Sequence, residues 1–116
     1  MSPKARERRF RMIYDMGCAV CFIEGWPHEP CQIQHLVDEG NRELSGGDAA
    51  TIGLCPWHHM GLPANGASLK QMYVMRGPSL RLSSKEFNER WPQRRLLQLV
   101  NNKLAEREAS LISRAS

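Results

Sequence analysis

The sequence predicts a small α+β domain that is stabilised by a bound zinc ion. Two pairs of residues with metal-ligand spacing lie in the first half of the chain: C-x-x-C at residues 18–21 and C-x-x-H at residues 55–58. Between these pairs, two short apolar segments flank a Gly-rich stretch, which is typical of a β-hairpin. Both ends of the chain carry apolar residues at helical spacing.

Composition limits the size of the fold and the class of partner. A chain of 116 residues is expected to form one domain, residues 1–116. Only 7% of the residues are aromatic and the mean hydropathy is −0.49, so the core is thin and a structural metal would contribute to stability. The net charge of +4 and the pI of about 9.1 suit a polyanionic partner.

Residues 1–16 are predicted to form a basic N-terminal helix or arm. Phe10, Ile13 and Tyr14 lie on one side of a helix over residues 4–16, and Gly17 is a suitable terminator. Four arginines surround this stripe: Arg6, Arg8, Arg9 and Arg11. They form either a solvated face, which we favour, or a phosphate-contacting arm. No apolar run follows that would make a secretory signal or span a membrane, so we expect a cytoplasmic protein without a membrane partner.

Cys18 and Cys21 are the first half of the predicted zinc site. A C-x-x-C segment turns so that both sulfurs face one point, as tetrahedral zinc requires. Disulfides would suit a secreted chain, and a redox pair would need a parallel α/β pattern that the sequence lacks. His28 and Cys31 lie in the Gly/Pro-rich loop that follows. Histidine and cysteine are both common metal ligands, but we expect these two residues to have no metal role.

Residues 32–37 (QIQHLV) and 51–54 (TIGL) are predicted to pair as a hairpin with a long loop. In the first strand, His35 shares a face with Ile33 and Val37, while Gln34 lies on the other face. Taken alone, His35 would be interpreted as a core histidine. Pro56 then begins a short helix at its first position.

The short helix carries two adjacent histidines that cannot easily serve one metal, because their side chains point roughly 100° apart. His58 completes a Cys₃His zinc set, and His59 is free for a second site. The full set of expected zinc ligands is Cys18, Cys21, Cys55 and His58. Because the strand–loop–strand–helix unit brings its first strand against its helix, we expect His35 and His59 to face a common cleft. Such a pair supports metal-assisted phosphodiester hydrolysis.

The remaining chain is predicted to be helical over residues 62–109. A short helix is expected over residues 67–75, and a second begins at Ser83 or Ser84, where Ser83 and Glu86 approximate a capping box. Pro92 opens the last helix, whose core face carries Leu96, Leu97, Val100 and Leu104. Residues 110–116 are expected to fray.

The central unit resembles the HNH, or ββα-metal, endonuclease motif, which combines a His-containing strand, a Gly-rich loop and a Leu-Cys-x-x-Cys-His segment. The matching segments here are residues 34–36 (QHL), 45–48 (SGGD) and 54–59 (LCPWHH). From about residue 17 to residue 105 the chain is similar to the recombination-enhancement (Ref) family of phage and prophage nucleases, which act with the host recombinase RecA. The further segments that carry this likeness are residues 17–21 (GCAVC), 77–80 (GPSL), 84–87 (SKEF) and the helix at Leu96 and Leu97.

The resemblance implies a role for each candidate residue. His35 would be the general base, and His59 would bind the catalytic Mg²⁺ or Mn²⁺ ion, while the Cys₃His set would hold structural zinc. It also implies a zinc-stabilised HNH/ββα-metal unit over residues 17–61, DNA as substrate, RecA as a partner, and the host cytoplasm as location.

Two positions depart from the nuclease pattern. Gln34 stands where such nucleases usually have an Asp or His ligand, and a neutral amide is a weaker ligand for a hard dication. The Asn expected before Leu54 is absent, so Asp48 is the candidate replacement ligand. The alternative to an endonuclease is therefore a catalytically inactive, zinc-stabilised module that binds DNA or protein.

Overall fold

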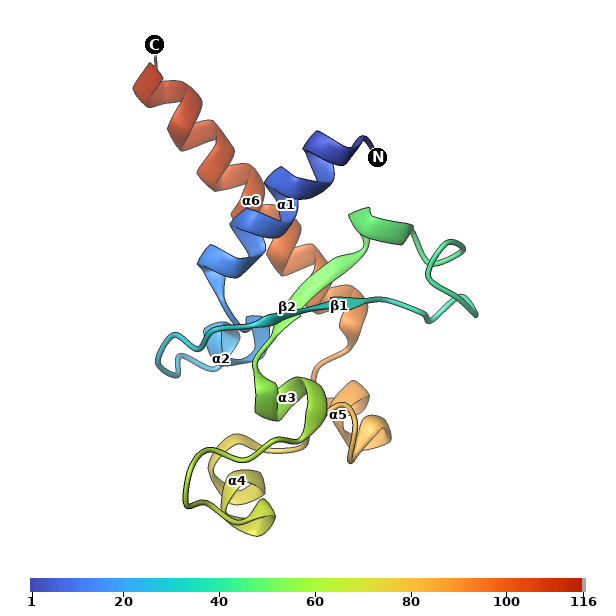
Figure 1. Ribbon diagram of the computed structural model, residues 1–116, viewed down its shortest axis with the longest axis vertical. Coiled ribbons are helices and arrows are strands. Elements are labelled where there is room, and N and C mark those ends of the chain that lie inside the picture. The colour runs from blue at the N-terminus through green and yellow to red at the C-terminus, as the bar shows by residue number, and fades with distance from the viewer. Residues whose placement is uncertain (116) are drawn as a thin grey trace.

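The computed structural model describes residues 1–115 and confirms the α+β class. This part of the chain forms a two-stranded sheet and six α-helices (Figure 1). The helices are α1 (Pro3–Met16), α2 (Ala19–Ile23), α3 (Pro56–Met60), α4 (Leu69–Arg76), α5 (Ser84–Arg90) and α6 (Gln93–Ala115); the strands are β1 (Gln32–His35) and β2 (Thr51–Leu54), preceded by the short 3₁₀ helix η1 (Gly47–Ala49). No helix within the described residues is both long and apolar enough to cross a membrane.

The predicted hairpin is present and lies at the centre of the molecule. β1 and β2 are antiparallel, and Gln34 pairs with Ile52 while His35 pairs with Thr51. All of β2 is buried, whereas β1 is half-buried or exposed. Because neighbouring residues of a strand point to opposite faces, the hairpin presents Gln34 on one face and His35 on the other. This alternation decides which helix each side chain meets.

Helices cover the hairpin from two ends. In Figure 1, α1 and α6 lie together at one end of the molecule, and α3, α4 and α5 lie at the other. The first position of α3 is Pro56, as predicted. The predicted core face of α6 is buried, together with residues from the other five α-helices and from β2. Two of the largest buried side chains are Trp57 and Trp91, and the largest of those that are fully buried are Phe87, Ile13, Leu36, Ile52, Leu54 and Leu96.

Gly53 is the point of closest approach between β2 and the N-terminal segment. A Cβ at this position would lie 2.5 Å from the Cys31 sulfur and 2.9 Å from the Gly17 carbonyl oxygen. We expect Gly53→Ala to destabilise the fold by about 1–3 kcal/mol, because the backbone carbonyl cannot rotate away. Denaturant unfolding would measure this loss. The double variant with Cys31→Ala should recover part of it, and an unchanged midpoint for Gly53→Ala would contradict the argument.

Three local predictions were wrong. Ser83 makes no side-chain capping bond; the capping box forms instead between Ser68 and Gln71, at the start of α4. The carboxylate of Glu86 instead accepts a hydrogen bond from the Tyr73 hydroxyl. Val37 lies beyond the end of β1 and is exposed.

The expected fraying is not seen at residues 110–115, where α6 continues to Ala115; Ser116 lies outside the described residues.

Candidate metal centre and active site

Four buried side chains from two separate segments form one cluster. Cys18 and Cys21 lie at the start of α2, and Cys55 and His58 lie at the start of α3. Their ligand atoms all lie within 4.8 Å of one another. The sulfurs of Cys18, Cys21 and Cys55 lie 3.6, 3.7 and 3.2 Å from Nδ1 of His58. Adjacent ligands of a tetrahedral zinc ion are spaced by about 3.5 to 3.8 Å, given Zn–S and Zn–N bonds of about 2.3 and 2.1 Å.

The backbone around α4 fixes the orientation of His58. Its Nε2 donates a hydrogen bond to the Arg76 carbonyl over 2.8 Å, so in the neutral ring the lone pair of Nδ1 faces the sulfurs. The imidazole also stacks against Trp26, with ring centroids 5.9 Å apart, and meets the edge of Trp91 at 5.4 Å. Such outer contacts select the ligand tautomer in metal sites. The chemistry and the spacing of these four side chains therefore fit a zinc ion.

The cysteines of the cluster shift one another's pKa values in opposite directions. Hydrogen bonds from Cys21 and Cys55 lower the pKa of Cys18 to about 3, and the same interactions, with burial, raise the pKa of Cys21. A dication in the cluster would favour the thiolate form of all three cysteines. None of the cysteines is in a disulfide.

The two spare candidates lie outside the cluster. The Cys31 thiol donates to the Ile13 carbonyl at 3.4 Å, and burial raises the pKa of this thiol to about 12, so it stays neutral. Nε2 of His28 lies 3.3 Å from the carbonyl oxygen of Asp15. Neither side chain is among the four that form the cluster.

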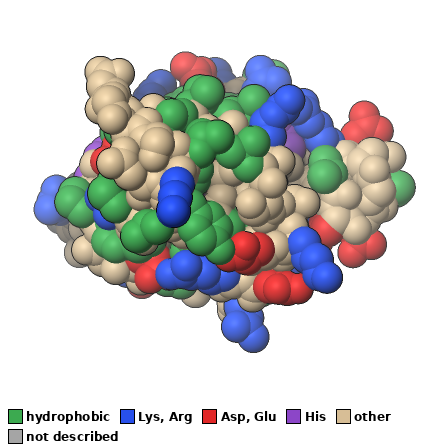
Figure 2. Space-filling view, turned by 90° about the horizontal axis from the view of Figure 1, so that it is seen from below, with side chains coloured by type: hydrophobic (Ala, Val, Ile, Leu, Met, Phe, Trp, Pro, Cys, Tyr) green, Lys and Arg blue, Asp and Glu red, His purple; other side chains and the backbone are tan. Residues whose placement is uncertain are grey.

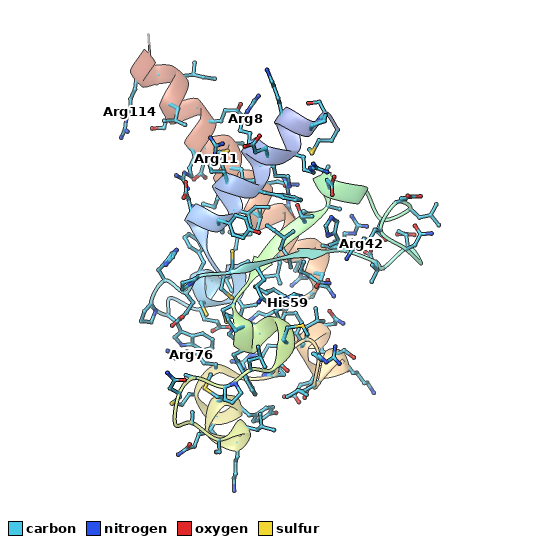
Figure 3. All side chains as sticks on the ribbon, in the orientation of Figure 1. Arg8, Arg11, Arg42, His59, Arg76 and Arg114 are labelled. Carbon is cyan, nitrogen blue, oxygen red and sulfur yellow. The ribbon has the colours of Figure 1, made fainter. Side chains whose placement is uncertain are left out.

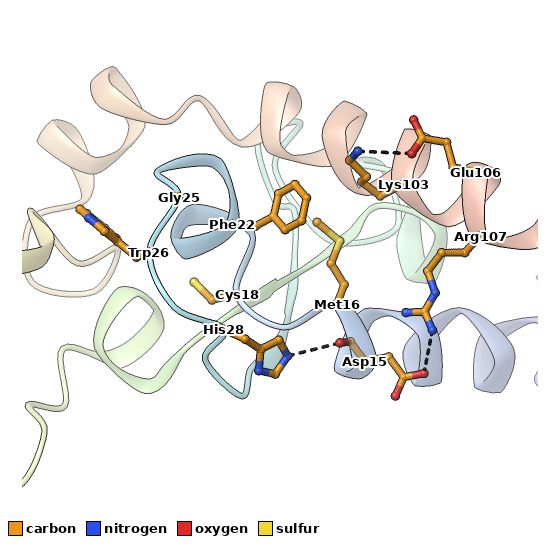
Figure 4. Close-up of a pocket in the computed structure, with 10 residues that line it drawn as sticks. All are labelled: Asp15, Met16, Cys18, Phe22, Gly25, Trp26, His28, Lys103, Glu106 and Arg107. Carbon is orange, nitrogen blue, oxygen red and sulfur yellow. Dashed lines mark hydrogen bonds and ion pairs between the residues drawn. The ribbon is translucent and has the colours of Figure 1, made fainter.

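A cavity of about 520 Å³ adjoins the cluster on the side of α2 and α6 (Figure 4). Two of its lining side chains are basic, and each has an acidic neighbour: Lys103 pairs with Glu106 and Arg107 pairs with Asp15, both at 3.3 Å. None of the residues that line this cavity is a candidate catalytic residue from the sequence. We therefore assign the cavity no part in the candidate active site.

His35 is held by Asp48, a residue of η1. Nε2 of His35 lies 2.8 Å from Oδ1 of Asp48. This hydrogen bond lowers the pKa of Asp48, so the carboxylate is ionised and can only accept. His35 therefore carries its proton on Nε2, and in the neutral ring Nδ1 is left as a proton acceptor. The ring of Phe10 meets His35 edge-on at 6.2 Å. Asp48, expected as a metal ligand, is thus placed where it orients the candidate base.

Arginines of α1 lie beside this pair. Nη1 of Arg6 lies 4.0 Å from the Asp48 carboxylate. Arg9 donates to both the hydroxyl and the carbonyl of Thr51, at 2.8 and 2.7 Å, and burial lowers its pKa. The solvated-face interpretation was therefore wrong for Arg9, which joins α1 to β2. No sequence signal identified this contact, because its partner lies 42 positions away.

His59 lies on the other face of β1, against two glutamines. Its Nδ1 is 2.6 Å from Oε1 of Gln32, and its Nε2 is 2.9 Å from Oε1 of Gln34. The Gln34 amide nitrogen donates to the His35 carbonyl at 2.9 Å, which fixes the amide so that its oxygen faces His59. Burial lowers the pKa of His59, which favours the neutral imidazole that a metal ligand requires. Gln32 was missed from the sequence.

The structure thus forms two pairs from the predicted residues. Gln34 meets His59, and His35 meets Asp48, but no hydrogen bond or ring contact within residues 1–115 joins His35 to His59. Their side chains lie on opposite faces of the hairpin, so a common cleft stays a prediction. Figure 3 shows His59 near the middle of the molecule, with Arg8 and Arg11 of α1 toward one end and Arg76 toward the other.

A model of one known protein family matches residues 3–105, from the first residue of α1 well into α6. The family is described as "Recombination enhancement, RecA-dependent nuclease". Comparison with curated proteins and with solved structures gave no match.

Proposed function

Because the chain belongs to the family of recombination-enhancement, RecA-dependent nucleases, we propose that it is a divalent-metal-dependent HNH endonuclease that hydrolyses DNA. In this proposal the Cys₃His cluster binds zinc, which holds α2 and α3 around the hairpin. The catalytic groups then lie on β1, η1 and α3.

The observation that carries the proposal is the hydrogen bond between His35 and Asp48. A general base must have a free lone pair and a fixed orientation. With its proton on Nε2 held by the carboxylate, the ring can take a proton from an attacking water at Nδ1. Asp48 then stabilises the imidazolium that forms, as an acidic partner does for the base in other hydrolases.

The donors that fit a second ion are Oε1 of Gln34 and a ring nitrogen of His59. These two atoms lie 2.9 Å apart, and neighbouring ligands of an octahedral ion with bonds of about 2.1 Å are about 3 Å apart. Bound there, Mg²⁺ or Mn²⁺ would supply positive charge that stabilises the leaving phosphate oxygen. Gln34 and His35 are adjacent in β1, so the ion and the base would act at the same end of the strand.

Exposed arginines of α1 are suited to contact the DNA backbone. Arg8 pairs with Glu108 at 3.7 Å, and Arg11 pairs with Glu7 at 3.3 Å. Exposed ion pairs of this kind contribute little to stability, so these guanidinium groups can exchange their partners for phosphates. Phosphate contacts carry no sequence information, and we therefore expect little sequence preference.

The second candidate function is a binding module on the same scaffold without catalysis. Gln34 favours it, because a neutral amide is a weaker ligand for a hard dication than the carboxylate it replaces. Within residues 1–115, the one group of three or more His, Cys, Asp or Glu side chains that could hold a metal is the Cys₃His cluster.

Cleavage assays separate the two candidates. Zinc-quantified protein would be incubated with single-stranded and duplex DNA in Mg²⁺ or Mn²⁺, with and without RecA and ATP. We expect cleavage that requires both the added ion and the RecA filament. Reactions without a divalent ion give the background. If the folded, zinc-replete protein cleaves DNA under none of these conditions, the binding module becomes the better proposal.

A further inference from the structure

The end of the molecule formed by α4 exposes an unusual amount of apolar surface. Of the side chains of α4, only that of Met72 is buried. The exposed hydrophobic residues of this helix are Leu69, Tyr73, Val74 and Met75. Leu69 and Tyr73 share one side of the helix, and Val74 and Met75, which we call the α4 face, lie on another. Val74 is 75% exposed and Met75 is 52% exposed. Figure 2 views this end of the molecule and shows hydrophobic side chains gathered there, with charged side chains mainly around them.

The α4 face includes a hollow that could accept a partner's side chains. A depression of about 510 Å³ lies between α4 and the loop before it, lined by Asn65, Gly66, Ala67, Lys70, Gln71, Val74 and Met75. Apolar surface of this kind, rimmed by polar residues, marks interaction sites in soluble proteins. A phosphate backbone would gain nothing by covering Val74 or Met75, so the occupant is a protein surface.

The contacts of α4 show that Val74 and Met75 are not needed to hold it in place. An isolated helix of this length is unstable in water. The capping box of Ser68 and Gln71 begins it. At its other end, His58 donates to the Arg76 carbonyl at 2.8 Å, and the Trp57 indole donates to the Gly77 carbonyl at 3.0 Å. The helix is thus held by capping, by its buried methionine, by α3 and by the hydrogen bond from Tyr73 to Glu86 of α5, which leaves the α4 face open.

We propose that the α4 face is the surface that docks on the RecA filament. This inference rests on the proposed function and names the contact that its partner would make. The family to which the chain belongs is described as RecA-dependent, which favours a surface that contacts a protein partner. The α4 face is apolar and exposed, as such a surface should be. It lies at the end of the molecule opposite α1, whose arginines suit DNA (Figure 1).

Docking at this position would leave the candidate active site accessible. The same short helix α3 supplies His58, which holds the end of α4, and His59, which faces β1. A filament on the α4 face would therefore fix α3 through a direct hydrogen bond, while α1 and β1 stay free to meet a DNA strand.

Binding to preassembled filaments tests the proposal without depending on cleavage. All proteins would carry His35→Ala, so that no DNA is cut, and RecA would be assembled on single-stranded DNA with a non-hydrolysable ATP analogue. The test variant is Val74→Gln with Met75→Gln. Its matched control is Leu111→Gln with Ile112→Gln, a pair of neighbouring hydrophobic residues on α6 that are 57% and 65% exposed. Both changes add no charge and keep good helix formers.

We expect the α4 variant to lose at least about tenfold in filament affinity, as loss of central apolar contacts does at other interfaces, while its affinity for free DNA and its zinc content stay unchanged. The α6 control should bind filaments like the parent.

Equal binding by the α4 variant would overturn the proposal. So would sedimentation equilibrium showing a parent dimer that the α4 variant abolishes, since the face would then join two copies of this chain. Wild-type cleavage is measured separately, so failure of docking and failure of the nuclease proposal are distinguishable.

Discussion

Cys21→Ala is expected to give a protein that binds no zinc and does not fold stably. The change removes one of four buried ligands whose donor atoms lie within 4.8 Å of one another. Structural zinc contributes apparent binding energies on the order of 10–16 kcal/mol in small peptides, which is comparable to the whole stability of a typical domain. The thin core cannot replace this contribution. Metal analysis, far-UV circular dichroism and sedimentation of the purified variant would show the loss.

Cys31→Ala is the matched control for this experiment. Cys31 is partly buried like a core residue, but its sulfur contacts the Ile13 carbonyl and lies outside the cluster. The control should therefore keep one zinc per chain and a cooperative unfolding transition. A Cys21→Ala protein that is zinc-replete and stable would refute the Cys₃His assignment. Chelation of zinc from the wild type should reproduce the effect of Cys21→Ala, because the same contacts between α2 and α3 are lost.

His35→Ala is expected to reduce the rate of DNA cleavage by about 10²–10⁴-fold, the usual contribution of a general base. The fold should be kept, because the side chain is linked to the rest of the protein mainly through the Asp48 hydrogen bond and the Phe10 contact. Single-turnover cleavage on RecA filaments would measure the rate, and filament affinity should not change. His28→Ala removes an exposed loop histidine and serves as the control. Equal cleavage by His35→Ala and the wild type would exclude His35 as the base.

Asp48→Asn separates positioning from catalysis at the same site. An amide can donate as well as accept, so it no longer forces the His35 proton onto Nε2. We expect a lower kcat with little change in KM, because the base is present but less often in the productive tautomer. Asp48→Glu should restore part of the rate if its carboxylate reaches the ring. An unchanged kcat for Asp48→Asn would show that Asp48 does not position the base.

Local patterns in the sequence determined much of the fold. The C-x-x-C and C-x-x-H spacings identified the four residues that the structure brings together, since ligands three positions apart lie on one side of a turn. The hairpin followed from the Gly-rich stretch between two apolar segments. The buried face of α6 followed from helical periodicity. Each ligand pair, the hairpin loop and the periodic face of α6 is a local pattern, which is why sequence alone reveals them. That the two ligand pairs join followed from the four ligands that zinc requires.

Capping was less predictable, because several serines compete for the same role. Ser68 and Ser83 both precede helices and are followed three residues later by Gln71 and Glu86. Only the first pair forms a capping box, because Glu86 accepts from Tyr73 of the neighbouring helix. A contact between two helices thus overrides a local signal.

The arrangement of the candidate active site was decided by tertiary structure alone. The sequence supplied His35, His59, Gln34 and Asp48 as candidates, but their pairing depends on which face of β1 each occupies and on where α1, η1 and α3 lie. The structure pairs His35 with Asp48 and His59 with Gln34, and it adds Gln32 and Arg9 from positions that no motif marks. The physical reason is that strand alternation separates His35 from Gln34, but long-range packing decides which element meets each face, and that packing is not encoded in the spacing of the residues.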